Sequence, residues 1–441
     1  MKQGKKWYSL DNSSKIFPAT TSDGRKNTFF LSAVLKEEVN KEILEQAVNE
    51  VLKRFPSFCV RLKRGMFWYY LEENTKPFKL TEEDANFLET FNEKENNNYL
   101  FKVSAYEKKI TITFFHTITD GNGAIEFLKA LVFEYLFLSG KPVKREGIIK
   151  SLEAPALDSE TEDTSVFVSS KSEDVKLPKD KKAFRTFGTP FDYDGQGVII
   201  GSINIENLKK ITKEKKVTIT CYLSAVLIYS IYQAFIQNKK QSLKKLNKNV
   251  VAFIPVNMRK VFGGETLRNF LGYIRLNHDF TEEVGFEEIL NSCKKQMQEK
   301  LTEENMKKLV SDNVKIEKNF FLRIMPLFIK DLAIKLSYSR VGDCLHTCNL
   351  SNLGSVNIPE SMKEYLEDIY FILDVGTKTK TNVSVVGYDD HINVCFSRFF
   401  KETELERLFF KHFTDLGLNV KIISNYWEKR IWNTVKIVKL M

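Results

Sequence analysis

Proline, glycine and cysteine are all scarce in this sequence. Only 10 of its 441 residues are Pro and 20 are Gly, which excludes collagen-like and low-complexity chains. Because 43% of the residues are hydrophobic and 28% are charged, the composition is that of a folded globular protein. We expect two or three domains with a large core at this length.

The six cysteines are spread along the chain, so we expect no disulfide scaffold and a reducing compartment. Cys344 and Cys348 flank His346, and these residue types can bind a metal. They lie, however, in an alternating stretch where cysteine usually acts as a small buried hydrophobe, and no second ligand pair follows. We therefore predict no metal site.

No apolar segment follows the basic N-terminus, MKQGKKWYSLDNSSK, so we find no secretory signal and expect a cytoplasmic protein. One uncharged run, 217–236, is long enough to span a bilayer. It contains Thr, Ser, Tyr and Gln residues, and Thr218 or Thr220 is suited to cap a helix. We therefore predict a buried core helix there.

Basic residues exceed acidic ones by 10, which raises the question of a polyanionic partner. The basic residues are scattered among polar ones, as on solvated helix faces, and no zinc finger or ribonucleoprotein motif is present. We therefore expect no nucleic-acid partner, and a phosphorylated cofactor suits the charge better.

Apolar periodicity is interrupted by acids, Ser, Thr and Lys over residues 149–182. This break predicts an N-terminal half over 1–150, a linker or surface loop over 151–182 and a C-terminal half over 183–441.

Helix and strand patterns alternate in both halves. The spacing of apolar residues predicts helices over 40–54, 220–237, 286–302, 318–336 and 402–416. Runs of β-branched and aromatic residues predict strands over 58–62, 67–71, 99–106, 110–115, 198–205, 250–256, 272–277, 370–375, 382–388 and 392–398. The class is therefore α/β or α+β, with a mixed sheet in each half.

The predicted strand 110–115 ends in His116, and Asp120, Gly121, Asn122 and Gly123 precede a helical pattern. Catalytic groups concentrate on such loops between rigid elements, and an imidazole there is well placed as a base. Composition alone predicts roughly 0.03 cases of a His with an acid at +4 and Gly at +5. The structural alternative is a His that ends a strand and an Asp that caps a helix.

The segment HTITDG resembles the HxxxDG motif of the acyltransferase superfamily that includes chloramphenicol acetyltransferase, condensation domains and alcohol acetyltransferases. Three further segments are similar in the same order: LKRFPSFCVRL (52–62), IPVNMR (254–259) with RNFLGY (268–273), and CNLSNLG (348–354). The resemblance covers nearly the whole chain and is closest to the alcohol acetyltransferase branch. Phe55 stands where many condensation domains have His, and the plant-type DFGWG is absent from the sequence.

The resemblance implies two chloramphenicol-acetyltransferase-like half-domains that form a V around a central channel. It also implies one active site, because Leu350 and Ser351 follow His346 where Asp and Gly would stand.

The chemistry that the resemblance implies is transfer of an acyl group, acetyl above all, from a CoA thioester to an alcohol hydroxyl. His116 would be the general base, Asp120 would form a structural ion pair with Arg259, and Gly121 would keep the channel clear. Acyl-CoA would be a co-substrate and no cofactor would stay bound. Weaker candidates for donors to the oxyanion are Ser351, Asn352 and Ser384.

Two alternatives stay open: a condensation-like enzyme that takes its donor from a carrier protein and forms an amide or ester, and a non-catalytic relative. No G-x-S-x-G elbow, Walker A or G-x-G-x-x-G fingerprint points to other chemistry. The basic, aromatic tail 427–441 is suited to contact a membrane surface, with a docked terminal strand or helix as the alternative.

Overall fold

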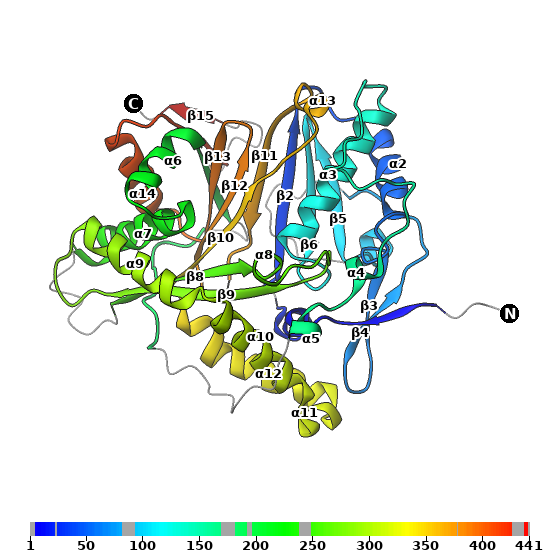
Figure 1. Ribbon diagram of the computed structural model, residues 1–441, viewed down its shortest axis with the longest axis horizontal. Coiled ribbons are helices and arrows are strands. Elements are labelled where there is room, and N and C mark those ends of the chain that lie inside the picture. Colours follow the sequence, from blue (N-terminus) through cyan, green and yellow to red (C-terminus); the bar gives the residue numbers. More distant parts are fainter. Residues whose placement is uncertain are drawn as a thin grey trace.

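The computed structural model describes residues 5–22, 24–81, 93–168, 181–191, 196–237, 248–376 and 378–425, and the backbone of 436–439. Its strands form sheets of eight, four and three strands, and helices pack on the two larger sheets (Figure 1). The mixed α/β class is thereby confirmed. The V with a central channel stays a prediction.

The four-stranded sheet belongs mainly to the N-terminal half, and helices α2 (Lys41–Leu52) and α3 (Gly121–Leu138) pack against each other beside it. All its pairings are antiparallel, so the expectation of a mixed sheet is not met here. One edge strand comes from the C-terminal half and joins the two halves. The strand order is β11 (Leu366–Leu373), β2 (Thr28–Leu35), β6 (Lys109–Phe115), β5 (Phe101–Tyr106).

The eight-stranded sheet is mixed, as expected for the C-terminal half. Its strand β10 runs parallel to both neighbours, whereas the other pairings are antiparallel. The order is β15 (Lys436–Lys439), β14 (Val420–Ser424), β7 (Gly197–Asn204), β13 (His391–Arg398), β12 (Thr381–Tyr388), β10 (Cys348–Ser355), β8 (Asn249–Asn257), β9 (Leu271–Asp279).

Helix α7 (Ile219–Ile231) lies in the core of this half, as predicted. Thr218 caps it, since its side chain accepts a hydrogen bond from the Cys221 N–H at 3.1 Å. Among the described residues, Ile219–Ile236 is the one helical stretch long and apolar enough to cross a membrane, and 67% of it is buried. The other helices of this layer are α6 (Ile205–Glu214), α9 (Phe286–Lys300) and α14 (Glu404–Asp415).

Helices α10 (Glu303–Lys318), α11 (Phe320–Ile324) and α12 (Leu327–Ser337) lie below both large sheets in Figure 1. A continuous helix over 318–336 was expected, and this prediction is wrong. Pro326 has no N–H to donate and disfavours helical geometry at Met325, so the chain breaks there and restarts as α12.

The small sheet and the short turns complete the fold. The three-stranded sheet has the order β1 (Trp7–Ser9), β4 (Tyr69–Glu73), β3 (Val60–Arg64). The short helices are α1 (Ile16–Thr20), α4 (Asp158–Thr161), α5 (Ser165–Val168), α8 (Arg259–Phe262) and α13 (Glu360–Lys363), with single turns η1 (Ser13–Lys15), η2 (Glu93–Asn96), η3 (Tyr232–Ile236), η5 (Tyr338–Gly342) and η6 (Asp343–Leu345).

The segment 151–182, expected as a linker or surface loop, contains a buried anchor. Glu160 is 1% exposed and receives hydrogen bonds from Arg54 at 2.6 and 3.0 Å and from Lys150 at 2.5 Å. Residues 169–180 of this segment lie outside the described residues, as does the tail 427–441 apart from β15. The domain boundaries stay a prediction.

Candidate active site

The loop between β6 and α3 holds the predicted motif. Strand β6 is rich in β-branched and aromatic residues and ends at Phe115. The N–H of His116, the next residue, donates to the Asn27 carbonyl at 2.9 Å. Asp120 caps α3, because its carboxylate accepts from the N–H groups of Asn122 and Gly123 at 3.0 and 3.3 Å. The loop is therefore fixed at both ends, with the imidazole between them.

Asp120 and Arg259 form the ion pair that the resemblance implies. The carboxylate is fully buried, and its Oδ2 accepts from Arg259 Nη1 at 2.8 Å and from the Phe270 N–H at 2.9 Å. The Arg259 guanidinium also donates to the backbone carbonyls of Thr266, at 2.8 Å, and of Arg268. Asp120 is thus saturated with donors and acts on the loop, not on a substrate.

A hydrogen bond to Asn269 fixes the tautomer of His116. Asn269 Nδ2 donates to the His116 carbonyl at 2.9 Å and to Asp11 Oδ2 at 3.3 Å. Its Oδ1 lies 2.8 Å from His116 Nδ1 and must be the acceptor, because the amide nitrogen is already committed. The proton of the neutral ring therefore sits on Nδ1, and Nε2 carries the free lone pair.

Aromatic rings surround the imidazole. Phe17 stacks on it with ring centroids 4.4 Å apart, and Phe29 meets it edge-on at 5.1 Å. Burial in this environment lowers the pKa of His116 below its ordinary value, since the charged form loses hydration. The ring is consequently neutral at pH 7, the state in which it can accept a proton.

Asp11 and Asn269 were not among the predicted site residues. Asp11 is fully buried, and burial raises its pKa to about 6, opposed by Arg268 at 3.6 Å. Its carboxylate also accepts from the Ser14 N–H at 2.8 Å. The segment RNFLGY, noted in the sequence for its likeness to a family motif, was the available signal for Asn269. No sequence signal pointed to Asp11, which reaches the site through tertiary contact.

The position beside Gly121 where a Cβ would stand is already occupied. A Cβ on this residue would lie 2.2 Å from Cδ2 of Leu353 on β10. At Gly123 a Cβ would lie 2.1 Å from the Leu267 carbonyl oxygen and 2.2 Å from Thr119 Oγ1. The two glycines therefore let the start of α3 pack closely against the C-terminal half. That Gly121 keeps a channel clear stays a prediction.

The predicted oxyanion donors are not brought together. Ser384 is fully buried and donates its hydroxyl hydrogen to the Phe371 carbonyl at 2.5 Å, and Asn352 Nδ2 donates to Thr220 Oγ1 at 3.0 Å. Both side chains have other hydrogen-bond partners in this structure, and their roles at the oxyanion stay predictions. Ser351 is half-buried on β10 and pairs in register with Ser384 of β12.

The segment that contains Cys344, His346 and Cys348 is built as core. Cys348 is fully buried, and the His346 ring lies 5.1 Å from Phe253. Within the described part of the chain, no three His, Cys, Asp or Glu side chains are grouped as metal ligands.

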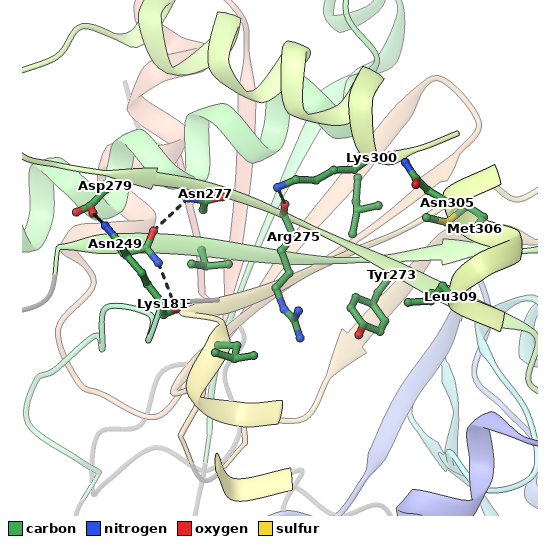
Figure 2. A pocket seen from close by; sticks show the side chains of 13 residues that line it. Lys181, Asn249, Tyr273, Arg275, Asn277, Asp279, Lys300, Asn305, Met306 and Leu309 are labelled. Carbon is green, nitrogen blue, oxygen red and sulfur yellow. Dashed lines mark hydrogen bonds and ion pairs between the residues drawn. The ribbon is translucent and has the colours of Figure 1, made fainter. Parts of the chain in front are cut away.

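A cavity of about 490 Å³ opens beside β9 (Figure 2). Lys300 reaches across the strand to the Arg275 carbonyl at 2.7 Å, and Lys181 pairs with Asp279 at 3.1 Å. No residue of the network around His116 lines this cavity, so it is a separate feature of the C-terminal half.

The family is decided by a model described as alcohol acetyltransferase, which matches residues 163–391, more than half of the chain. The chain belongs to the alcohol acetyltransferase family. The residues that match the alcohol acetyltransferase model include Arg259, Asn269 and Ser351. His116 and Asp120 precede the matched range. Membership confirms the resemblance stated from the motifs and makes the chain an acyltransferase.

Solved structures agree with the fold of this family member. The F. sporotrichioides TRI101 structure with Coenzyme A and T-2 matches with a TM-score of 0.59 at 12% identity, over 91% of this chain and 97% of that one. The starter condensation domain of rhizomide synthetase RzmA, with C8-CoA and Leu-SNAC, matches at 0.57 and 11% identity, over 93% and 94%. Polyketide synthase associated protein 5 from Mycobacterium tuberculosis matches at 0.56 and 12% identity, over 93% and 98%. No curated protein sequence matches the chain.

Proposed function

We propose that this acyltransferase moves an acetyl or other acyl group from a CoA thioester to the hydroxyl of an alcohol, with His116 as general base. The observation that supports the base most directly is the 2.8 Å hydrogen bond between His116 Nδ1 and Asn269 Oδ1. It leaves Nε2 as the proton acceptor of a neutral imidazole, which is the state that general-base catalysis requires.

In the proposed reaction, Nε2 takes the proton of the alcohol as its oxygen attacks the thioester carbonyl. A C–O bond forms, the C–S bond breaks, and the imidazolium returns the proton to the departing thiolate of CoA. Positioned general bases of this kind contribute about 10²–10⁴ in rate. Ser351 is the candidate that we retain for a donor to the oxyanion.

The choice of donor is supported by relatives and not by a ligand of this chain. TRI101 was solved with Coenzyme A, and the RzmA starter condensation domain with C8-CoA. A carrier-protein donor is the alternative, because condensation domains are also among the structural neighbours.

The test measures thiol release from acetyl-CoA and longer acyl-CoAs with a panel of alcohols and amines. We expect release that depends on an alcohol, and a loss of about 10²–10⁴ in kcat with His116→Ala. Phe137→Ser, an exposed change on α3, is the control that should keep full activity.

A folded chain that releases no thiol from any CoA donor would reject the CoA-dependent function. Turnover only with an acylated carrier protein would then support the condensation-like alternative. Full activity of His116→Ala would reject the assigned base.

A further inference from the structure

Helices α11 and α12 carry an unusual concentration of exposed apolar side chains. Phe320, Phe321 and Phe328 are 67%, 73% and 66% exposed. At about 150–250 Å² per aromatic side chain, these three alone present about 400 Å², near the largest apolar patch of a typical monomer. Ile324, Leu332 and Leu336 extend this surface at helical spacing. We call these six residues the α11–α12 apolar face.

Helix α12 turns Leu327 and the charged residues Lys330 and Asp331 toward the protein and several other apolar side chains outward. Lys330 is 3% exposed, and its Nζ donates to the Phe67 carbonyl at 2.7 Å and lies 3.2 Å from the centre of the Trp68 ring. Asp331 accepts from the Tyr69 hydroxyl at 2.9 Å. Because Lys330 and Asp331 hold α12 on the β3–β4 hairpin, the apolar side chains that point outward do not fix the helix in place.

The neighbouring hairpin continues the apolar surface. The Leu327 N–H donates to the Met66 carbonyl at 2.9 Å, so the hairpin tip lies beside the start of α12. Met66 is 75% exposed and Phe67 is 39% exposed. Two separate elements thus present apolar side chains at one edge of the molecule, the lower edge in Figure 1.

The charge around this face is positive. Lys330 is turned inward, and Asp331, the one acid of residues 318–337, accepts from the Tyr69 hydroxyl on the hairpin side. Lys318, Arg323 and, further along, Lys335 are exposed beside the apolar face. Exposed Phe and Leu flanked by basic side chains are typical of helices that lie in the interface of an anionic membrane.

We propose that the α11–α12 apolar face docks this protein on membranes that contain anionic lipids. The apolar side chains would enter the boundary between headgroups and acyl chains, and the basic side chains would contact lipid phosphates. Helix α12 packs against α1, whose Phe17 stacks on His116, so docking brings the membrane within one helix layer of the imidazole. This docking is independent of the proposed acyl transfer.

The test is cosedimentation of the full chain with phosphatidylcholine vesicles, with and without one quarter phosphatidylserine. The test variant combines Phe320→Ser, Phe321→Ser and Phe328→Ser, and a charge variant combines Lys318→Glu and Arg323→Glu. The matched control is Phe137→Ser, since Phe137 is 57% exposed at the end of α3. Circular dichroism would verify that each variant is folded.

We expect the wild-type chain and the Phe137→Ser control to bind the phosphatidylserine vesicles. Both other variants should show a partition coefficient lower by about tenfold or more. Any thiol release with a short, water-soluble alcohol should be equal in all four proteins, which separates docking from catalysis.

Three outcomes would overturn the proposal. They are no sedimentation of the wild-type chain with any vesicle, unchanged sedimentation of the triple Ser variant, and equal binding to vesicles without phosphatidylserine. A dimer in analytical ultracentrifugation that the triple Ser variant dissociates, without vesicle binding, would assign the face to a second copy instead.

Discussion

Replacing Asn269 by Ala removes the acceptor that holds the Nδ1 proton of His116. Asn269 is 1% exposed, so it does not offer a surface to substrate and acts as a positioning residue. Loss of a buried hydrogen-bond partner costs about 1–3 kcal/mol. If that cost falls on the reactive tautomer and orientation of His116, kcat falls by about 5- to 150-fold.

The assay is steady-state thiol release over a range of acceptor concentrations. We expect kcat to fall while KM stays within about twofold, because an interaction made through the base and not with the substrate is lost. Asn269→Asp adds a second readout. A carboxylate beside Nδ1 stabilises the imidazolium and raises the pKa of His116, so the acid limb of the pH–rate profile should move to higher pH.

A matched control is Asn393→Ala. Asn393 is also fully buried and donates to Asp368 Oδ1 at 2.6 Å and to the Ile369 carbonyl at 2.9 Å, with no contact to His116. This variant should lose stability but keep its kcat. A folded Asn269→Ala enzyme with wild-type kcat and an unchanged pH profile would refute the reasoning.

Three further predictions follow from the same contacts. Asp120→Ala leaves the partly buried charge of Arg259 without its carboxylate, and urea denaturation should show a loss of about 3–5 kcal/mol, with retained stability counting against a structural pair. Glu160→Gln should reduce the free energy of unfolding at pH 7. Burial alone would raise the pKa of Glu160, but the hydrogen bonds from Arg54 lower it to about 2, so its stabilisation is present above pH 4.5 and is lost as the pH falls toward 2. A wild-type pH series of unfolding, compared with Glu160→Gln, checks this, and parallel curves would contradict it. Because burial lowers the pKa of His116, the acid limb of kcat/KM should lie below pH 6.5, and a limb above that value would argue against this base.

His116 and Asp120 could be predicted because the signals for them are local in the sequence or belong to a motif. The strand, the loop and the helix around His116 follow from periodicity, and capping chemistry explains Asp120 at the start of α3. The partner Arg259 came from the resemblance and lies 2.8 Å from Asp120 in the structure. Family membership was likewise recognised from the segments that resemble family motifs.

The donors were harder to predict because side-chain direction depends on tertiary structure. Asn352 continues the regular pairing of Leu350 and Ser351 with β12, so alternation predicts which face of β10 it lies on, but not that its amide donates to Thr220 there. Ser384 faces β11, a strand of the other sheet, and its hydroxyl is consumed by the Phe371 carbonyl there. Pro326, by contrast, was a visible signal for the break between α11 and α12.

The origin of β11 has a consequence for synthesis. Strand β2 ends at Leu35, but its partner β11 begins only at Leu366. At 5–20 residues per second, a ribosome needs roughly 20 s to 1 min to make the chain between them. During that time one edge of the N-terminal sheet lacks its strand, and unpaired edges invite aggregation. The nascent N-terminal half therefore exposes the backbone groups of this edge of β2 until the C-terminal half supplies β11.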